Sequence, residues 1–420
     1  MLERMAESPD IVDLTITNVA HGGVFVARHE GRVIFVPDTI PGEVVRARIV
    51  DTRKKSFWRA ETLEVLEASP DRVEHVWSAA SIDRDPGDRA GGAEFGHIAL
   101  PAQRRLKGEV LSDALVRFGG LDESVPATRT VVEPTPGDAN GDGRGWRTRV
   151  SLHVDDEGRV GPYAVRSHRV IPVDDLPLAS PAVAEAAPLH DRLEGSTTVD
   201  VVQSSDAVIV AVDGVAGGGP LREVVGDRTY TLDPLGFWQV HREAASVLAG
   251  AVAGAVDPAR FDPSAPNLDL YGGVGLFAGT LADRFGRDIR ITTVESESSA
   301  TDHAAENLAD VLGGRAVTAR VDRFLRQIGG DAGTHRYRDA TIVLDPPRSG
   351  AGTAVVRSVT ALAPAQIVYV ACDPVALARD TRTLGEDGYE LVALRAFDLF
   401  PHTHHVEAVA TFVRAGNGRP

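Results

Sequence analysis

The sequence contains a single cysteine, Cys372, among its 420 residues. One thiol cannot close a disulfide within the chain, and it cannot ligate an iron–sulfur cluster through several cysteines. No segment reaches the roughly 18 uninterrupted apolar residues that a membrane-spanning helix needs. The first eight residues, Met1–Ser8, carry charges and lack the apolar stretch of a secretory signal. We therefore expect a cytoplasmic protein without a membrane partner.

The composition is that of a globular protein, with 43% hydrophobic and 25% charged residues. A chain of 420 residues is too long for one hydrophobic core, so two to three domains are expected. The formal charge of −16 argues against indiscriminate binding of polyanions, because nucleic-acid affinity depends on contacts between cations and phosphates. A local basic surface remains compatible with that total.

Basic residues gather in one segment near the N-terminus, where they alternate with two aromatic rings. Cations can contact phosphates while rings stack on unpaired bases, so this composition suits single-stranded RNA. A solvent-exposed strand and loop would show the same composition, and the sequence favours neither reading. The residues of this basic–aromatic cluster are Arg46, Arg48, Arg53, Lys54, Lys55, Phe57, Trp58 and Arg59.

Two regions precede the C-terminal part of the chain. Short alternating runs and sharp turns over residues 8–68 predict a small barrel like the oligonucleotide-binding fold. Residues 75–225 combine an expected helix, Ala102–Phe118, with β-like runs at Arg147–Val154 and Val199–Val212, which indicates a central α+β region that binds RNA. The acidic loop Gly137–Gly143 lacks the closing glutamate of a calcium loop, so no metal is expected there.

Residues 226–416 alternate strand with helix, which predicts a doubly wound, Rossmann-like α/β domain with an antiparallel edge. Ligands bind such sheets at the carboxyl ends of their strands. We expect strands at Asn267–Tyr271, Ile289–Val294, Ala316–Val321, Ala340–Leu344, Gln366–Tyr369, Tyr389–Phe397 and His405–Phe412, and helices at Gly275–Phe285, Ser298–Val311, Thr353–Leu362 and Pro374–Glu386.

The first of these strands runs into a glycine turn with Gly273 and Gly275. The third glycine of a dinucleotide turn is absent, since Ala278 stands at the matching place. Glu295 ends the second expected strand, where it could bind ribose hydroxyls, and Asp322 is expected to end the third, where it could meet an adenine amino group. Together these features favour S-adenosylmethionine over a nicotinamide nucleotide.

The end of the fourth strand carries Asp345 and Arg348 in the run Asp-Pro-Pro-Arg. Amino-group methyltransferases have an aromatic residue in place of that arginine, so a different acceptor is implied. Carbon 5 of a pyrimidine becomes nucleophilic once a thiolate adds to carbon 6. Cys372 is the candidate nucleophile, with buried packing as its alternative role, and Glu407 is the candidate base that takes the proton from carbon 5.

These motifs, in this order, resemble those of the RNA uracil-5-methyltransferase family, which modifies tRNA or rRNA. The resemblance runs over residues 226–413, and the N-terminal barrel resembles the RNA-binding TRAM module of many family members. It implies a cofactor pocket lined by Gln239, Tyr271, Glu295 and Asp345, with Cys372 as nucleophile and Glu407 as proton acceptor. The motifs are Phe237–Val240, Asp269–Gly275, Leu344–Arg348, Tyr369–Cys372 and Phe400–Glu407.

Two departures from the family pattern stand out. Ala90–His97 resembles a cluster-binding stretch with both thiols replaced, so no iron–sulfur cluster is expected, and packing around Phe95 and His97 is expected to substitute for it. Asp373 stands where relatives commonly have asparagine. An ionised carboxylate there would raise the pKa of the neighbouring thiol, or it could accept a hydrogen bond from the uracil ring.

The expected function is therefore methylation of carbon 5 of a uridine in structured RNA, either rRNA or tRNA. An RNA-binding or folding factor that lost the chemistry is the alternative, and a cytosine-5 enzyme is less favoured because a second cysteine is lacking. His402, His404 and His405 cannot all face one metal ion, since neighbours on a strand point to opposite sides. One of them is expected to orient Glu407 or a phosphate. No obligate protein partner is inferred.

Overall fold

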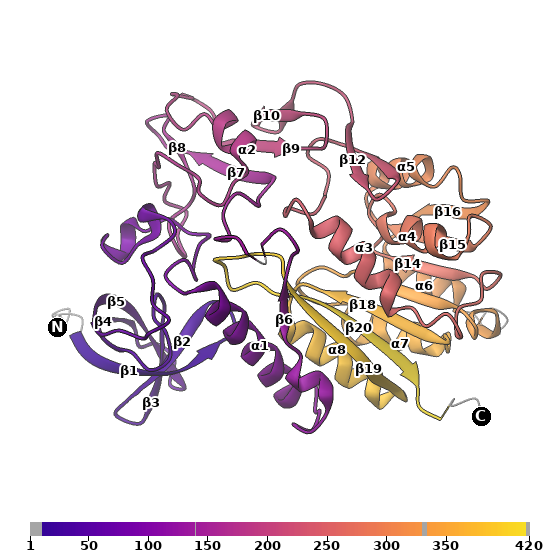
Figure 1. Ribbon diagram of the computed structural model, residues 1–420, viewed down its shortest axis with the longest axis horizontal. Coiled ribbons are helices and arrows are strands. Elements are labelled where there is room, and N and C mark those ends of the chain that lie inside the picture. Colours follow the sequence, from indigo (N-terminus) through magenta and orange to yellow (C-terminus); the bar gives the residue numbers. More distant parts are fainter. Residues whose placement is uncertain (1–10, 139, 330–333, 417–420) are drawn as a thin grey trace, which may run out of the picture.

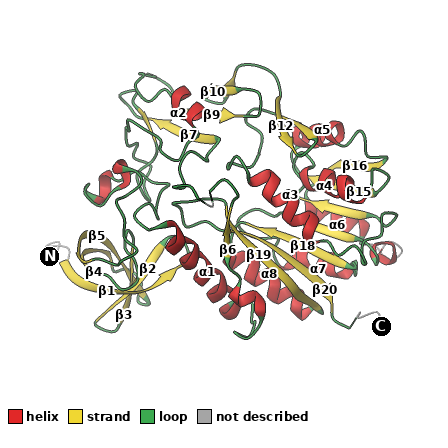
Figure 2. Cartoon of the chain, viewed as in Figure 1, coloured by secondary structure: helices red, strands yellow, loops and turns green. Residues whose placement is uncertain are grey.

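The computed structural model describes residues 11–138, 140–329 and 334–416 (Figure 1). Residues 8–10, with which the expected barrel begins, and residue 139 of the acidic loop lie outside this part. The described chain forms a closed N-terminal barrel, a five-stranded central sheet and an eight-stranded C-terminal sheet, all connected by the loops drawn in green in Figure 2. No helix in these ranges is long and apolar enough to cross a membrane.

The N-terminal strands close into a barrel in the order β1-β2-β3-β5-β4, which confirms the predicted fold of this region. Alternate residues point inward, so Phe25, Ile34 and Val45 are fully buried while their neighbours are more exposed. The strands are β1 (Ile11–Ala20), β2 (Val24–His29), β3 (Arg32–Val36), β4 (Val44–Asp51) and β5 (Phe57–Glu67).

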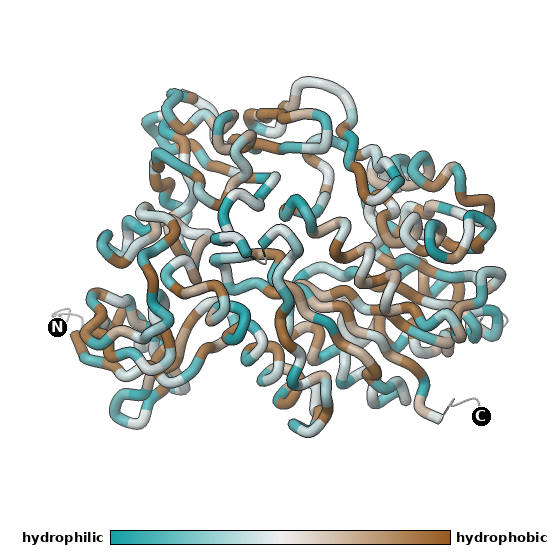
Figure 3. The backbone as a smooth tube through the Cα atoms, viewed as in Figure 1, coloured by the Kyte–Doolittle hydropathy of each residue, from teal (hydrophilic) through white to brown (hydrophobic). Residues whose placement is uncertain are grey.

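The C-terminal sheet has the order β16-β15-β14-β17-β18-β20-β19-β6, and the first five strands are parallel. β20 lies antiparallel between β18 and β19, which confirms the predicted Rossmann-like domain with an antiparallel edge. The central strands are buried and mostly apolar, as expected for a sheet covered on both faces. Figure 3 draws apolar residues in brown, and brown segments run through this sheet. The strands are β6 (Val132–Pro134), β14 (Asn267–Leu270), β15 (Arg290–Glu295), β16 (Gly313–Thr318), β17 (Thr341–Leu344), β18 (Gln366–Ala371), β19 (Tyr389–Asp398) and β20 (Glu407–Arg414).

Helices cover this sheet on both faces. The helix α8 begins and ends at the predicted residues, and its Asp373 cap accepts a hydrogen bond from the amide of Ala376 at 2.8 Å. The helices are α3 (Ala244–Ala255), α4 (Leu276–Phe285), α5 (Ser298–Asn307), α6 (Val321–Ile328), α7 (Thr353–Ala361) and α8 (Pro374–Glu386).

Most of the predicted C-terminal strands differ from the observed ones by one or two residues at an end, and the third parallel strand, expected at Ala316–Val321, is displaced by three at each end. β16 begins at Gly313, three residues before the expected start, because a side chain at this position would meet the carbonyl oxygen of Ile289 at 2.4 Å and only glycine fits against β15. The strand then ends at Thr318, so Asp322 lies in the first turn of α6 and not at a strand end.

The central region forms a sheet of its own and also supplies β6 to the C-terminal sheet. Its own sheet has the order β11-β10-β9-β7-β8, and the expected run Val199–Val212 divides into two strands. The helix α1 (Leu100–Arg117) lies between the barrel and the C-terminal sheet, where it packs against α8 (Figure 1). The other elements are β7 (Arg149–Val154), β8 (Val160–Gly161), α2 (Pro181–Ala186), β9 (Thr198–Gln203), β10 (Val208–Val212), β11 (Val215–Ala216), β12 (Leu221–Val225) and β13 (Arg228–Leu232).

A buried ion pair joins α1 to the end of β19. Lys107 donates from Nζ to Oδ1 of Asp398 at 2.5 Å and to the carbonyl oxygen of Phe400 at 3.0 Å, and both charged side chains are almost fully buried. Breaking a buried pair leaves one charge unpaired, which costs more than the pair itself contributes.

We predict that Lys107→Met lowers the free energy of unfolding by about 3–5 kcal/mol, because Asp398 is left buried without its partner. The double variant Lys107→Met/Asp398→Leu should regain most of that loss. Urea denaturation followed by circular dichroism measures both. A loss below about 1 kcal/mol for Lys107→Met, as for an exposed pair, would contradict this role.

Candidate functional site

The candidate nucleophile and base are brought together by strand register. Ala371 at the end of β18 pairs with Ala408 of β20, so the next residues along, Cys372 after β18 and Glu407 at the start of β20, reach the same edge of the sheet and line one cavity. Asp345 follows β17, the parallel neighbour of β18, and reaches the same edge of the sheet.

These residues line a cavity of about 840 Å3 at the carboxyl ends of the parallel strands. This is the place where open α/β sheets bind ligands, and the volume is that of a small-molecule site. Seven of the residues singled out from the sequence line it, and they are Gln239, Tyr271, Gly273, Glu295, Asp345, Cys372 and Glu407.

The glycine turn shapes the floor of this cavity. Gly273 has a φ of +52° and faces open space, as a backbone does where a ligand approaches closely. Gly272 is required for another reason, because a Cβ there would lie 1.9 Å from the hydroxyl of Thr293. Gly275, predicted as a cofactor residue, does not line the cavity: it begins α4 and faces Leu308.

Asp322 also lies outside the residues that line the cavity. Its carboxylate forms ion pairs with Arg320 at 3.0 Å and Arg326 at 3.1 Å, both on or next to its own helix. The strand-end placement that motivated the prediction was wrong, and these pairs occupy both carboxylate oxygens.

Buried carboxyl groups dominate the electrostatics of the cavity. Burial, reinforced by the charge of Asp269, raises the pKa of Asp345 to about 7, and no described group donates a hydrogen bond to its carboxylate. Burial and then the charge of Asp345 raise the pKa of Glu407 well above its usual value, while Arg348 opposes this. A carboxylate in such surroundings is a stronger base than one in water.

The same surroundings suppress ionisation of the thiol. Burial, followed by the charges of Glu407 and Asp345, raises the pKa of Cys372 to about 12, and Arg348 is the cation that lowers it. Arg348 lines the cavity beside Cys372. The motif containing Arg348 was recognised in the sequence, but no role in the site was predicted for this residue. The signal was present, because this arginine replaces the aromatic residue of the amino-group enzymes.

The three histidines near Glu407 serve packing and anchoring. The amide of His402 donates to Oε1 of Gln103 on α1 at 2.7 Å, and His404 pairs with Glu94 at 3.5 Å. No hydrogen bond joins any of them to Glu407 in the described part of the chain, so the expected orienting role finds no support in these contacts. Within the described ranges no three His, Cys, Asp or Glu side chains are grouped to hold a metal ion.

The segment that resembles a cluster-binding stretch is packed. Phe95 is buried in the barrel core with its ring centre 5.7 Å from that of Phe25, and its amide donates to the carbonyl oxygen of His402 at 2.9 Å. His97 is also buried, with Nε2 3.2 Å from the carbonyl oxygen of Thr39. The expected packing around Phe95 and His97 is therefore present.

Half of the basic residues in the predicted basic–aromatic cluster are paired with carboxylates. Arg46 pairs with Asp13 and Glu64, Arg48 pairs with Glu61, and Arg53 pairs with Asp51. The ring of Trp58 is half-buried beneath the Arg32 guanidinium, 4.7 Å away, rather than exposed for stacking. Cross-strand neighbours, which a sequence does not show, supply the carboxylates that pair with Arg46 and Arg48. Lys54 and Lys55 remain exposed.

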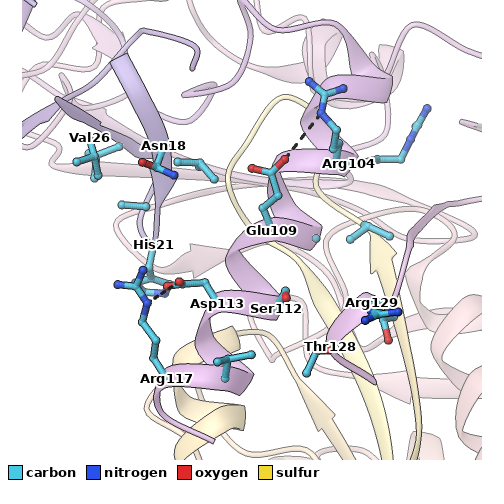
Figure 4. A pocket seen from close by; sticks show the side chains of 18 of the residues that line it. Asn18, His21, Val26, Arg104, Glu109, Ser112, Asp113, Arg117, Thr128 and Arg129 are labelled. Atoms are coloured by element: carbon cyan, nitrogen blue, oxygen red, sulfur yellow. Dashed lines mark ion pairs between the residues drawn. The ribbon is translucent and has the colours of Figure 1, made fainter. Parts of the chain in front are cut away.

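A groove of about 1450 Å3 separates the barrel from α1, and Arg59 is the one member of the cluster that lines it. Figure 4 shows the groove with Asn18 and His21 of the barrel on one side and Glu109, Asp113 and Arg117 of α1 on the other. Arg28, Arg59 and Arg129 also line it, and none of these three forms an ion pair within the described part of the chain. They are missed candidates, since the fold alone brings them together.

Comparisons with known proteins agree with this architecture. Residues 259–414 match the family model described as tRNA (uracil-5-)-methyltransferase, and residues 10–58 match the TRAM domain. An uncharacterized RNA methyltransferase of Streptomyces avermitilis is 38% identical, with 97% of this chain and 99% of that protein covered. One of Bifidobacterium longum is 36% identical, with 96% of each chain covered. The chain belongs to the RNA uracil-5-methyltransferase family.

A solved structure shares the fold of this RNA uracil-5-methyltransferase. The tRNA (uracil-54, C5)-methyltransferase of Pyrococcus abyssi, in complex with S-adenosyl-L-homocysteine, superposes with a TM-score of 0.71 at 21% identity. The match covers 95% of this chain and 99% of that one. Membership of the family makes this protein an S-adenosylmethionine-dependent enzyme that binds RNA, which confirms the predicted class and cofactor and disfavours a factor without chemistry.

The raised thiol pKa leads to a direct test, because the chain has only one cysteine to label. We predict that alkylation of Cys372 by iodoacetamide is slow at pH 7 and accelerates toward pH 12, following the thiolate fraction. Glu407→Gln should move the midpoint of the pH–rate profile down, and Arg348→Met should move it up.

Glu390→Gln, an exposed carboxyl change on β19, is the control and should leave the profile unchanged. A midpoint near the ordinary thiol value of about 8.5 in the unmodified protein would contradict the electrostatic description of the site.

Proposed function

We propose that this enzyme transfers a methyl group from S-adenosylmethionine to carbon 5 of a uridine in structured RNA, in the cytoplasm. The observation that carries the proposal is the register of β18 and β20, which brings a lone thiol and a buried carboxyl group into one cavity. A nucleophile and a base are the two groups that this reaction requires. Three domains, at residues 8–68, 75–225 and 226–416, would divide RNA binding from catalysis.

The cavity fits the cofactor. Glu295 ends β15 beside the open glycine turn, where a carboxylate can bind ribose hydroxyls, and Gln239 also lines the cavity. The Asp345 carboxylate faces the cavity without a donor from the described protein, so it can accept hydrogen bonds from the amino group of a bound amino acid. S-adenosylmethionine supplies an electrophilic methyl group when bound and leaves as S-adenosylhomocysteine.

Cys372 and Glu407 carry the chemical steps. The thiol gives its proton to solvent, and Sγ adds to carbon 6 of uracil, which moves an electron pair onto carbon 5. Carbon 5 then bonds to the methyl carbon as the methyl–sulfur bond breaks. Glu407 takes the proton from carbon 5, the bond between carbon 6 and Sγ breaks, and the ring double bond forms again. Arg348, the cation that lowers the pKa of the thiol, favours the first step.

RNA would reach the site along the groove between the barrel and α1. Its unpaired cations, Arg28, Arg59 and Arg129, can contact phosphates, whereas Arg46, Arg48 and Arg53 of the basic–aromatic cluster already have carboxylate partners. The target nucleotide must leave its stack, because the thiolate approaches the face of the ring. The relative from Pyrococcus abyssi acts on tRNA; both tRNA and rRNA are substrates to test.

We predict that Cys372→Ala lowers methyl transfer by more than about 10³-fold while S-adenosylmethionine still binds, because only the nucleophile is lost. RNA in which 5-fluorouridine replaces uridine should trap the unmodified enzyme, since Glu407 cannot remove fluorine from carbon 5. Denaturing gels and peptide mass spectrometry should place the RNA on Cys372. Methyl incorporation by Cys372→Ala at the unmodified rate would exclude the mechanism.

We predict that Glu407→Gln lowers turnover about 10²- to 10⁴-fold and accumulates a covalent adduct with natural RNA, because the methylated ring keeps its carbon 5 proton. The adduct should appear as a slowly migrating band on denaturing gels. Glu390→Gln serves as the matched control and should show neither effect. Slow turnover without an adduct would assign Glu407 to a step before carbon–sulfur bond formation.

A further inference from the structure

A second, smaller cavity adjoins the cofactor pocket at Cys372. It has a volume of about 190 Å3, and Cys372, Arg348 and His405 line both cavities. Ordinary small-molecule pockets measure roughly 300–1,000 Å3, so this one suits a single base better than a whole nucleotide. A ring placed there would lie against the thiol, next to the cofactor pocket.

The outer side of this small cavity comes from the barrel, not from the catalytic domain. Residues 20–23, the end of β1 and the β1–β2 turn, line it together with Asp373 and Pro374 at the start of α8. Ala20 and His21 also line the groove that carries the unpaired arginines. The turn therefore stands between the proposed RNA path and the thiol.

One hydrogen bond joins this turn to the residue next to the nucleophile. His21 Nε2 lies 2.7 Å from Oδ2 of Asp373, and the other oxygen of Asp373 accepts from the amide of Ala376. The hydrogen bond with Asp373 raises the pKa of His21, although burial opposes this. Burial also disfavours an ionised Asp373, but the hydrogen bonds from His21 and Ala376 outweigh it and lower the pKa of this carboxyl. The contact thus favours the charged form of each group.

A second contact brings the β1–β2 turn close to His404, in the segment between β19 and β20. Gly23 has a φ of +72°, and a Cβ there would lie 2.9 Å from Nδ1 of His404. Since His404 also lines the small cavity, even a methyl group on Gly23 would push the turn away from it. Gly31, in the β2–β3 turn, has a similar φ of +79° but faces open space.

We propose that the β1–β2 turn of the barrel is the outer wall of the pocket that holds the target uracil, and that His21 is the positioning residue that fixes this wall to Asp373. The inference rests on the proposed function, because it assigns the base to the cavity beside Cys372. It gives Asp373 a structural purpose in this chain, since a carboxylate binds His21 more strongly than an amide does.

Two readouts test the wall. The first is alkylation of Cys372 by N-ethylmaleimide in enzyme saturated with S-adenosylhomocysteine, where the reagent must enter from the base side. The second is single-turnover methyl transfer to tRNA and to rRNA fragments. His21→Ala should speed alkylation several-fold and slow methyl transfer about 10- to 100-fold, because a misplaced wall no longer orients the ring. The Kd for S-adenosylmethionine should stay unchanged.

Matched variants separate positioning from loss of folding. His21→Gln keeps an N–H donor and should regain most of the rate, and His29→Ala, at the far end of β2, should behave as the unmodified enzyme. In an Asp373→Ala background, His21→Ala should add little further effect. Gly23→Ala should slow methyl transfer more than Gly31→Ala, which carries similar backbone strain without the contact.

The outcomes distinguish this proposal from the proposed function. An unmodified enzyme that methylates no RNA would overturn the function and the pocket assignment with it. An active enzyme in which His21→Ala matches the unmodified protein in both readouts would overturn the wall alone, and so would additive effects of His21→Ala and Asp373→Ala.

Discussion

The antiparallel pairing of β20 with β18 is the constraint on which the site depends. This pairing brings Glu407 to the edge of the sheet where Cys372 lies, and a slip of one residue would turn the carboxyl group to the other face of the sheet. The register is well specified, because β18 is buried along its whole length and β20 along most of its own. Packing of two hydrophobic strands thus fixes the relative position of the two reactive groups.

Burial also determines how the site behaves at rest. Burial raises the pKa of Asp345, Glu407 and Cys372; the charge of Asp345 adds to this at Glu407 and at Cys372, and the charge of Glu407 adds to it at Cys372. These effects favour the protonated thiol in the free protein, and Arg348 is the cation whose charge opposes them. A thiol with a raised pKa reacts slowly with other electrophiles, which suits an enzyme that must react with an RNA base.

Much of this arrangement could be predicted from the sequence. Strand-end motifs placed Cys372, Glu407, Asp345 and Glu295 in one cavity, because parallel strands end at a common edge and glycine, proline and buried runs mark those ends. Local patterns failed where partners distant in sequence decide the outcome. Cross-strand carboxylates neutralise Arg46 and Arg48, and the packing of Gly313 against β15 shifts a strand so that Asp322 falls on a helix. The His21–Asp373 contact spans 352 positions and has no local signal.

The central claim is that a uridine loses its carbon 5 proton to gain a methyl group. RNA labelled with tritium at carbon 5 of uracil, incubated with the enzyme and S-adenosylmethionine, measures both events in one reaction. The mechanism predicts one tritium released to water for each methyl group incorporated, with neither seen when S-adenosylmethionine is omitted. Methyl incorporation without tritium release would place the methyl group on another atom and contradict the assignment of Cys372 and Glu407.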